Sequence, residues 1–495
     1  MTENRYELVV GLETHVELKT RAKAFCGCEN RYGAPPNTLV CPVCMGLPGT
    51  LPVLNRRAME LAALAGFALN CRVNPISSFD RKNFFYPDLP KAYQITQFFY
   101  PLCEAGFVEI PADGGTKRIG ITRIHVEEDA GKLLHDRPGV TAIDLNRCGV
   151  PLIEIVTEPD FRTAEEASAY LKKLRAILTA AGVSDCRMNE GSLRCDVNLS
   201  LRRPGQPMGT RTEMKNLNSF QSVERAIRAE YARQAEILDA GGTVLQETLR
   251  FDQRTGKTIV MRRKETTGDY RYFPEPDLPP VVFSAEELER LRASLPMLPD
   301  EKRALFQQKY GLPRKAAELL TDEKWLADYF MRAAADARNP AALANLLLGE
   351  VFAQLTLRET PGTERDESSL PIPPRRLAAL SNLLDEGRVN SSTGKKILAA
   401  LFDEDVEPET YAQEHGLFLV TDENVLRQAA EQELPERFFL EMKDNIAQLK
   451  LAYEIGDGDR AINLDNEFHK MVYAAAGKLW TFGVVREQMV HFDRL

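Results

Sequence analysis

Three residues near the N-terminus, Glu13, His15 and Glu17, stand two apart in the segment YELVVGLETHVEL, Tyr6–Leu18. Carboxylate oxygens and a neutral imidazole are ligands that divalent metal ions take in proteins. Because the segment alternates as a strand does, the three side chains share one face, which makes a metal site one interpretation. The alternative is a solvated strand face, and this segment alone does not separate the two.

Four cysteines follow in two close pairs, Cys26 with Cys28 and Cys41 with Cys44. Two such pairs separated by a short loop can place four thiolates around one tetrahedral zinc ion. The CPVC knuckle with Gly46 close behind supports that interpretation, and a closed set of four sulfurs favours a structural site. The alternative is a loop that carries four reduced thiols.

Acidic side chains also enter two later strand-like segments. Glu154 interrupts the apolar run of PLIEIVTEPD. Because burying a lone carboxylate is costly, we expect Glu154 to be paired, metal-bound or at a strand end. The segment Ile119–Lys132 predicts a strand that runs into an acidic bend, with His125, Glu127, Glu128 and Asp129.

Two more segments place charged side chains on one strand face. Alternation in SLRCDVNLSLR puts Arg194, Asp196, Asn198 and Ser200 on the polar face. TRTEMKNLNSF does the same for Arg211, Glu213 and Lys215. The loop Phe79–Gln97, rich in proline and aromatic residues, adds three candidate phosphate contacts, Arg81, Lys82 and Lys91.

The chain has no GxxxxGK[ST] loop and no GxGxxG turn at a strand–helix junction. A bound nucleotide would therefore need the face of a sheet. On such a face, carboxylates can hold Mg²⁺ that bridges phosphates, and Lys or Arg can offset the charge that develops in the transition state.

The elements that must position these residues are strands with one apolar and one polar face, interleaved with amphipathic helices. The pattern predicts helices over Arg57–Leu69, from a capping box at Thr163 to Gly182, and from Asn218 or Ser219 to about Ala240. We expect an α+β fold with an antiparallel sheet, followed by helical regions.

At 495 residues the chain is too long for one core. We expect a catalytic domain over 1–292 with a zinc loop at 26–44, a helical domain over 293–402 and a tail domain over 403–495. A polar N-terminus and no apolar run of 18 residues predict a cytoplasmic protein without a membrane span. From Asp403 to Leu495 the chain has 20 acidic and 9 basic residues, so phosphate attraction favours the preceding part.

Long motifs follow one another between Tyr6 and Pro280: VVGLETHVELKT, CPVCMGLPGTLPVLN, FDRKNFFYPDLPKAYQITQ, ITRIHVEEDAGK, DLNRCGVPLIEIVTEPD, EGSLRCDVNLSLR, TEMKNLNSF and DYRYFPEPDLPP. Together they resemble the B subunit of the aspartyl/glutamyl-tRNA(Asn/Gln) amidotransferase. The resemblance continues through the helical region and fades after Gln432.

The resemblance implies a catalytic domain similar to glutamine synthetase in fold. It implies ATP-dependent activation of the side-chain carboxylate of misacylated Glu-tRNA(Gln) or Asp-tRNA(Asn) as an acyl phosphate, followed by amidation with ammonia. The family's pattern assigns Mg²⁺ ligation to Glu13, His15, Glu128 and Glu154. It assigns the handling of ATP and the activated carboxylate to Lys82, Asp196, Glu213 and Lys215, and a structural Zn²⁺ to the four cysteines.

The resemblance also implies partners: an amidase A subunit that supplies ammonia, a small C subunit that joins the two, and tRNA bound through the tail. No glutaminase nucleophile is evident in this sequence, which agrees with an external ammonia source. Two other functions stay open, a non-catalytic tRNA-binding scaffold and a free-standing ATP-dependent amide ligase. An intact carboxylate set argues against the scaffold.

Overall fold

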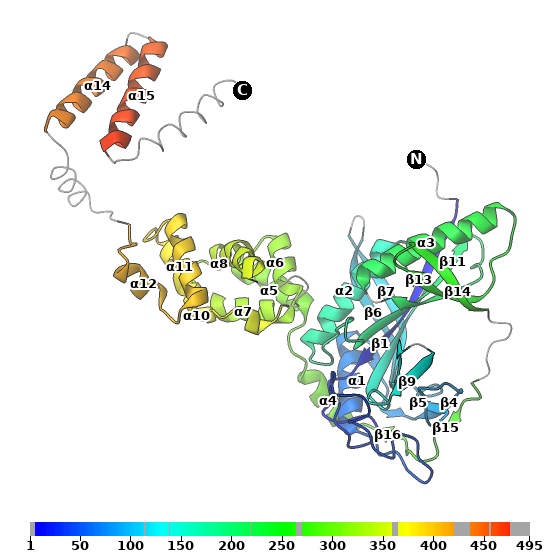
Figure 1. The fold of residues 1–495 in the computed structure, drawn as a ribbon. Helices are drawn as coiled ribbons and strands as arrows, with labels where there is room; N and C mark the ends of the chain where they lie inside the picture. Colours follow the sequence, from blue (N-terminus) through cyan, green and yellow to red (C-terminus); the bar gives the residue numbers. More distant parts are fainter. Residues whose placement is uncertain are drawn as a thin grey trace. The chain divides into compact units, whose positions relative to one another are not determined.

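The strand predicted at the N-terminus is β1, Glu7–Glu17, the middle strand of a nine-stranded sheet in the computed structural model of the chain (Figure 1). The structure describes residues 5–112, 115–137, 139–217, 219–263, 270–358, 365–419, 436–454 and 457–475. The chain divides into two compact units, Met1–Ser381 and Asn382–Leu495. The boundary between these units falls inside the helical domain predicted over 293–402, so the two divisions differ, and the predicted three domains stay a prediction.

The strand order of the large sheet is β14-β13-β12-β11-β1-β10-β7-β6-β2. Every neighbouring pair is antiparallel except β12 with β13, which is parallel. An antiparallel-dominated sheet in a mixed fold is thereby confirmed. Besides β1 the strands are β2 Arg72–Val73, β6 Cys103–Ala112, β7 Gly115–Glu128, β10 Pro151–Thr157, β11 Leu193–Arg202, β12 Thr212–Leu217, β13 Glu247–Asp252 and β14 Lys257–Arg263.

Alternation along β1 separates the two faces of the sheet as the sequence predicts. Val10 and Val16 are completely buried and Leu12 nearly so, whereas Glu13 and His15 on the opposite face stay partly exposed. Burying an aliphatic side chain of this size contributes roughly 1.5–3 kcal/mol. The strand is therefore anchored by one face, which leaves the other face for polar side chains.

Three amphipathic helices cover the apolar face and share one hydrophobic core with it: α1 Arg56–Ala68, α2 Ala164–Ala180 and α3 Phe220–Asp239 (Figure 1). Thr163 caps α2 by accepting from the Glu166 amide, although Glu166 itself accepts from Arg162 rather than closing the predicted box. Ser219 caps α3, which settles the start of that helix. The predicted helices are confirmed to within a few residues.

Smaller sheets accompany the large one. The loop Phe79–Gln97 contains β4 Asp80–Asn83 and β5 Tyr93–Thr96, which pair in the order β15-β4-β5 with β15 Phe273–Pro274. Two further pairs are β3 Ile76–Ser77 with β16 Val281–Val282, and β8 Lys132–Arg137 with β9 Val140–Asp144. Segments from 80 and 273 are thus brought together beside the large sheet.

Helices make up the rest of the described chain. The first unit adds α4 Ala285–Ala293, α5 Pro299–Tyr310, α6 Arg314–Thr321, α7 Lys324–Ala334, α8 Pro340–Leu346, the π-helix η1 Leu347–Val351, α9 Phe352–Arg358 and the 3₁₀ turn η2 Glu367–Ser369. The unit boundary falls inside α10, Pro374–Asp385. The second unit contains α11 Ser391–Asp403, α12 Pro408–Glu414, α14 Glu436–Glu454 and α15 Gly458–Ala475.

One continuous helical stretch, Pro340–Arg358, is long and apolar enough to cross a membrane by length and composition alone. Its residues Leu343, Leu347 and Val351 are completely buried within the first unit. Only 28% of its apolar window is buried, and a single helix that passes this test is weak evidence for a membrane span. The segment after Gln432, where the resemblance fades, lies partly outside the described residues.

Candidate active site

The pairing of three neighbouring strands brings together the residues of the first half of the site. His15 on β1 lies opposite Glu154 on β10, and Glu154 lies opposite His125 on β7. Glu127 follows His125 by two residues and therefore points to the same face. Three neighbouring strands thus deliver two imidazoles and two carboxylates to one patch of the sheet.

The atoms of this first cluster surround a common position. His15 Nε2 lies 3.7 Å from Glu127 Oε1 and 3.5 Å from Glu154 Oε2, while His125 Nε2 lies 3.4 Å from Glu154 Oε2. These separations are longer than good hydrogen bonds. Ligand atoms of His15, Glu127 and Glu154 all lie within 4.8 Å of one another, which suits binding to a shared cation.

Protons stabilise the first cluster when no cation is bound. Burial lowers the pKa of His15, but the close contact with Glu154 and its charge, with the charges of Glu127 and Asp196, raise that pKa to about 9. Burial opposes ionisation of Glu154, yet His125 and His15 hold its pKa well below the usual value. Two buried carboxylates therefore demand positive charge beside them, as protons or as a metal ion.

The structure brings Glu127, not Glu128, into this cluster. Glu128 is the next residue of β7, so its side chain points to the opposite side, where it is 3% exposed. Its carboxylate accepts from Lys91 Nζ and, at 3.0 Å, from the Ile95 amide. The choice of Glu128 over Glu127 came from the family's pattern, and the geometry corrects it: Glu128 does not face the cavity.

The second half of the site lies on β1, β11 and β12. Glu13 pairs across the strands with Asp196, and these two form a cluster with Glu213 in which ligand oxygens lie within 4.8 Å. Burial, and then the charges of neighbouring carboxylates, raise the pKa of Glu13. Three carboxylates this close repel one another unless a cation lies among them.

Side chains from adjacent strands orient the second cluster. Asn198 Nδ2 donates to Glu13 Oε1 at 2.9 Å, and Thr248 Oγ1 donates to Glu213 Oε2 at 3.1 Å. Lys215 Nζ hydrogen-bonds Asp196 and lies 2.9 Å from Glu213 Oε1. The predicted residue Lys215 is therefore in the site, and it offsets part of the negative charge.

The second cluster and the residues His15, His125 and Glu154 of the first line one cavity of about 590 Å³, which Lys82 borders from the small β15-β4-β5 sheet. Glu127 lines a second hollow of about 320 Å³, which shares His15 and Lys82 with the first. Burial lowers the pKa of Lys82, but the charges of Glu127, Tyr272 and Glu154 raise it overall. Its ammonium lies 5.0 Å from the centre of the Tyr270 ring. The predicted residues Glu13, His15, Lys82, Glu154, Asp196, Glu213 and Lys215 all line the cavity of about 590 Å³.

The cavity also presents a rim of aromatic side chains and Arg123, which were not singled out in the sequence, together with Arg211, which was. The rings of Phe98 and Tyr272 stack at 4.0 Å, and Arg123 lies 5.7 Å from the Phe98 ring. Among the described residues, the side chains of Arg123 and Arg211 form no hydrogen bond or ion pair, and both line the cavity. The alternation of β7 signals that Arg123 shares a face with His125; no comparable signal marks the tyrosines.

Residue Glu17 continues the row of Glu13 and His15 along β1 but leaves the cavity. It borders a neighbouring hollow of about 630 Å³ with Arg147 and Arg194. Burial and the adjacent Asp129 raise the pKa of Glu17 to about 8. Glu17 therefore lies outside the cavity that Glu13 and His15 line.

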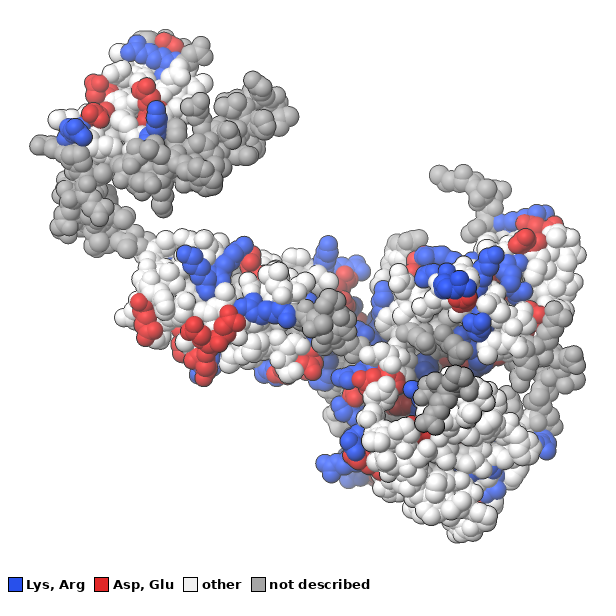
Figure 2. Space-filling view, in the orientation of Figure 1, with Lys and Arg blue, Asp and Glu red and all other residues white. Residues whose placement is uncertain are grey.

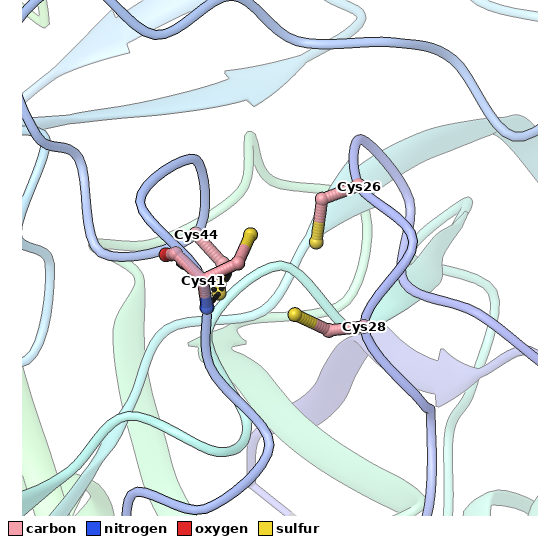
Figure 3. A group of neighbouring side chains, drawn as sticks. All are labelled: Cys26, Cys28, Cys41 and Cys44. Atoms are coloured by element: carbon pink, nitrogen blue, oxygen red, sulfur yellow. Dashed lines mark hydrogen bonds between the residues drawn. The ribbon is translucent and has the colours of Figure 1, made fainter.

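The four predicted cysteines converge in the loop between β1 and α1, with sulfurs facing a common space (Figure 3). All four sulfurs lie within 4.8 Å of one another, and Cys41 and Cys44 Sγ are 3.9 Å apart. A tetrahedral zinc–thiolate centre has edges of about 3.8 Å. The hydrogen bond from Cys26, and the Cys41 amide and Lys23 ammonium nearby, lower the pKa of Cys44 to about 4 although burial opposes this. The donor set fits Zn²⁺.

A sheet face with two carboxylate clusters and a separate cysteine quartet define a protein with two kinds of candidate metal site. A family model described as the GatB/GatE catalytic domain matches residues 8–289, and one described as the GatB domain matches residues 328–437. The chain belongs to the family of aspartyl/glutamyl-tRNA(Asn/Gln) amidotransferase B subunits.

Curated relatives carry that name and cover most of the chain. The protein of Caldicellulosiruptor saccharolyticus is 50% identical over 430 residues, which are 86% of this chain and 89% of the relative. That of Thermoanaerobacter sp. is 50% identical over 433 residues, 87% and 90% of the two chains. That of Carboxydothermus hydrogenoformans is 51% identical over 422 residues, 84% and 87%.

Proposed function

We propose that this chain activates the side-chain carboxylate of Glu-tRNA(Gln) or Asp-tRNA(Asn) with ATP and amidates it with ammonia. The observation that carries the proposal is the pair of carboxylate clusters that share one cavity with Lys82. Membership of the B-subunit family supports the tRNA substrate, because the relatives' names give aspartyl/glutamyl-tRNA. The likeness of the catalytic domain to glutamine synthetase is part of the proposal.

The two clusters are proposed to hold Mg²⁺, which would bridge nucleotide phosphates and neutralise their charge. His15, His125, Glu127 and Glu154 would bind one ion. Carboxylates of the second cluster would bind another, with Lys215 balancing the excess negative charge. The ligands are oriented by hydrogen bonds from Asn198 and Thr248, so little reorganisation is needed during the reaction.

The proposed reaction has two chemical steps. An oxygen of the substrate carboxylate attacks the γ-phosphorus of ATP, and the bond to the β-phosphate oxygen breaks to give an acyl phosphate and ADP. Ammonia then attacks the acyl carbon, phosphate leaves, and the proton lost from nitrogen ends on the released phosphate. Lys82 and Arg123 are placed to stabilise the charge on the transferring phosphoryl group.

The aromatic rim supports binding of a nucleotide or of the unpaired acceptor end of tRNA. Tyr86, Phe98, Tyr270 and Tyr272 line the cavity, and bases stack readily on such rings. Basic side chains that gather over α3 in Figure 2 offer less, because Arg228 pairs with Glu165 and Arg233 with Glu230. We therefore propose that the phosphate contacts lie at the cavity rather than on that helix.

We further propose that ammonia comes from an amidase A subunit, that a small C subunit joins the heterotrimer, and that the complex is cytoplasmic. Free ammonium at high concentration should then replace the amidase. The cysteine quartet is proposed to hold one structural Zn²⁺, since a closed set of four thiolates leaves no open position for catalysis.

The decisive experiment measures ADP release and amidated product with the isolated chain, ATP, Mg²⁺, ammonium and misacylated tRNA. ADP release that requires misacylated tRNA supports the proposal. ATP cleavage without tRNA would favour a free-standing ligase, and tRNA binding without any ATP cleavage would favour a scaffold. Asp196→Asn should lower the rate by roughly 100-fold or more, whereas the matched exposed control Asp185→Asn should not.

A further inference from the structure

Lys23 is a charged side chain that is completely buried beside the cysteine quartet, with 0% exposure. Its Nζ lies 3.6 Å from Cys44 Sγ, and no carboxylate among the described residues forms an ion pair with it. A buried ammonium is costly unless an anion compensates it. The Cys44 sulfur is the side-chain partner that Lys23 Nζ reaches, and as a zinc-bound thiolate it would supply compensating negative charge.

We propose that Lys23 is a positioning residue for the zinc centre: it donates an N–H···S hydrogen bond to the Cys44 thiolate and offsets the charge of the cluster. The inference rests on the zinc occupancy proposed above. Four thiolates around one Zn²⁺ carry a net negative charge, and the ammonium reduces it. Groups that hydrogen-bond metal ligands orient them and strengthen metal binding.

The loop that carries the cysteines packs against the Pro90–Lys91 segment, and Lys91 in turn contacts Glu128 of strand β7. Gly46, with φ +67°, follows the cysteine knuckle, and a Cβ there would come within 2.7 Å of Lys91 Cγ and 3.1 Å of the Pro90 carbonyl carbon. The knuckle and the Pro90–Lys91 backbone are therefore in close contact. Ordering of the knuckle by a bound ion limits the positions that Lys91 can take.

Lys91 carries this restraint to strand β7. Its Nζ hydrogen-bonds Glu128, which also accepts from the Ile95 amide at 3.0 Å, while Gln94 Nε2 donates to the Glu128 carbonyl at 2.7 Å. The next side chain back along β7 is Glu127, in the first cluster. Zinc bound by the quartet thus restrains the end of strand β7, which carries Glu127.

The test compares the full chain with Lys23→Met and with Lys19→Met, an exposed control on the same loop. Zinc transfer to the chelator 4-(2-pyridylazo)resorcinol should be roughly 10- to 100-fold faster for Lys23→Met and unchanged for Lys19→Met. In Co²⁺-substituted protein, Lys23→Met should shift the thiolate-to-metal charge-transfer band. Equal release rates and identical spectra in all three proteins would overturn the role of Lys23.

Three further measurements test the roles of Lys23 and of zinc. If Lys23→Met does not fold, Lys23→Gln retains a donor without the charge, and its release rate should lie above that of the wild type. Amide hydrogen exchange at Ile95 should become faster when the chelator removes zinc from the wild-type chain. Unchanged exchange would refute the restraint of strand β7 by zinc. A wild-type chain that holds no zinc and takes up no Co²⁺ would refute the zinc site itself while leaving the amidation assay unaffected.

Discussion

Competition between protons and a metal ion at His15 makes the binding of the proposed cation depend on pH. A metal binds the neutral imidazole, whereas Glu154 and Glu127 raise the pKa of His15 to about 9 when no cation is bound. At pH 7 the imidazole is then neutral in about 1% of molecules. The apparent affinity at pH 7 is therefore reduced by about 100-fold relative to the fully deprotonated site.

The expected result is an apparent dissociation constant that falls about tenfold per pH unit from pH 7 to pH 9 and levels off above that. The sign follows from the raised pKa: lowering the pH adds the proton that the cation must displace. Isothermal titration with Mn²⁺ at several pH values measures it, because Mn²⁺ accepts both carboxylate and imidazole ligands.

The control is His15→Gln, which keeps both carboxylate clusters. In this variant the Mn²⁺ dissociation constant should change less with pH. Any remaining dependence on pH reports His125, whose pKa is also raised by the two glutamates although burial opposes this. Equal Mn²⁺ affinities of the wild type at pH 7 and pH 9 would refute the reasoning. They would mean that no histidine in the first cluster binds the cation.

Further substitutions and a deletion test the remaining inferences. Glu13→Ala should abolish ATP-dependent ADP release while circular dichroism and zinc content stay unchanged; a mutant with normal amidation would exclude β1 from the mechanism. Glu127→Gln should lower the amidation rate far more than it lowers stability. Glu128→Gln should instead lower the free energy of unfolding, by roughly 3 kcal/mol, because it leaves a buried lysine without its charged partner; a larger rate loss for Glu128→Gln, with its stability unchanged, would restore the family's assignment. Deleting the chain beyond Gln432 should weaken tRNA binding in a filter-binding assay less than deleting from Arg375 onward, and equal losses would contradict this division.

Local sequence was enough to predict where side chains lie wherever the residues belong to one element or one short loop. Alternation in β1 separates Val10 and Val16 from Glu13 and His15, because successive side chains of any strand point to opposite faces. The spacing of the four cysteines predicted that their sulfurs converge, since two close pairs on one loop need little backbone rearrangement to meet. Capping side chains likewise predicted that α3 starts at Asn218 or Ser219, and the structure assigns the cap to Ser219.

Only the tertiary structure decided which polar residues share the cavity. Strand parity shows that Glu127 and Glu128 point to opposite sides, but the pairing of Glu154 with His125 determines which side is the site. Lys82 and Tyr272 come from segments nearly 200 residues apart, and they meet because β4 pairs with β15. A residue type and its local spacing set what a side chain can do, whereas strand register and the packing of distant segments set what it meets.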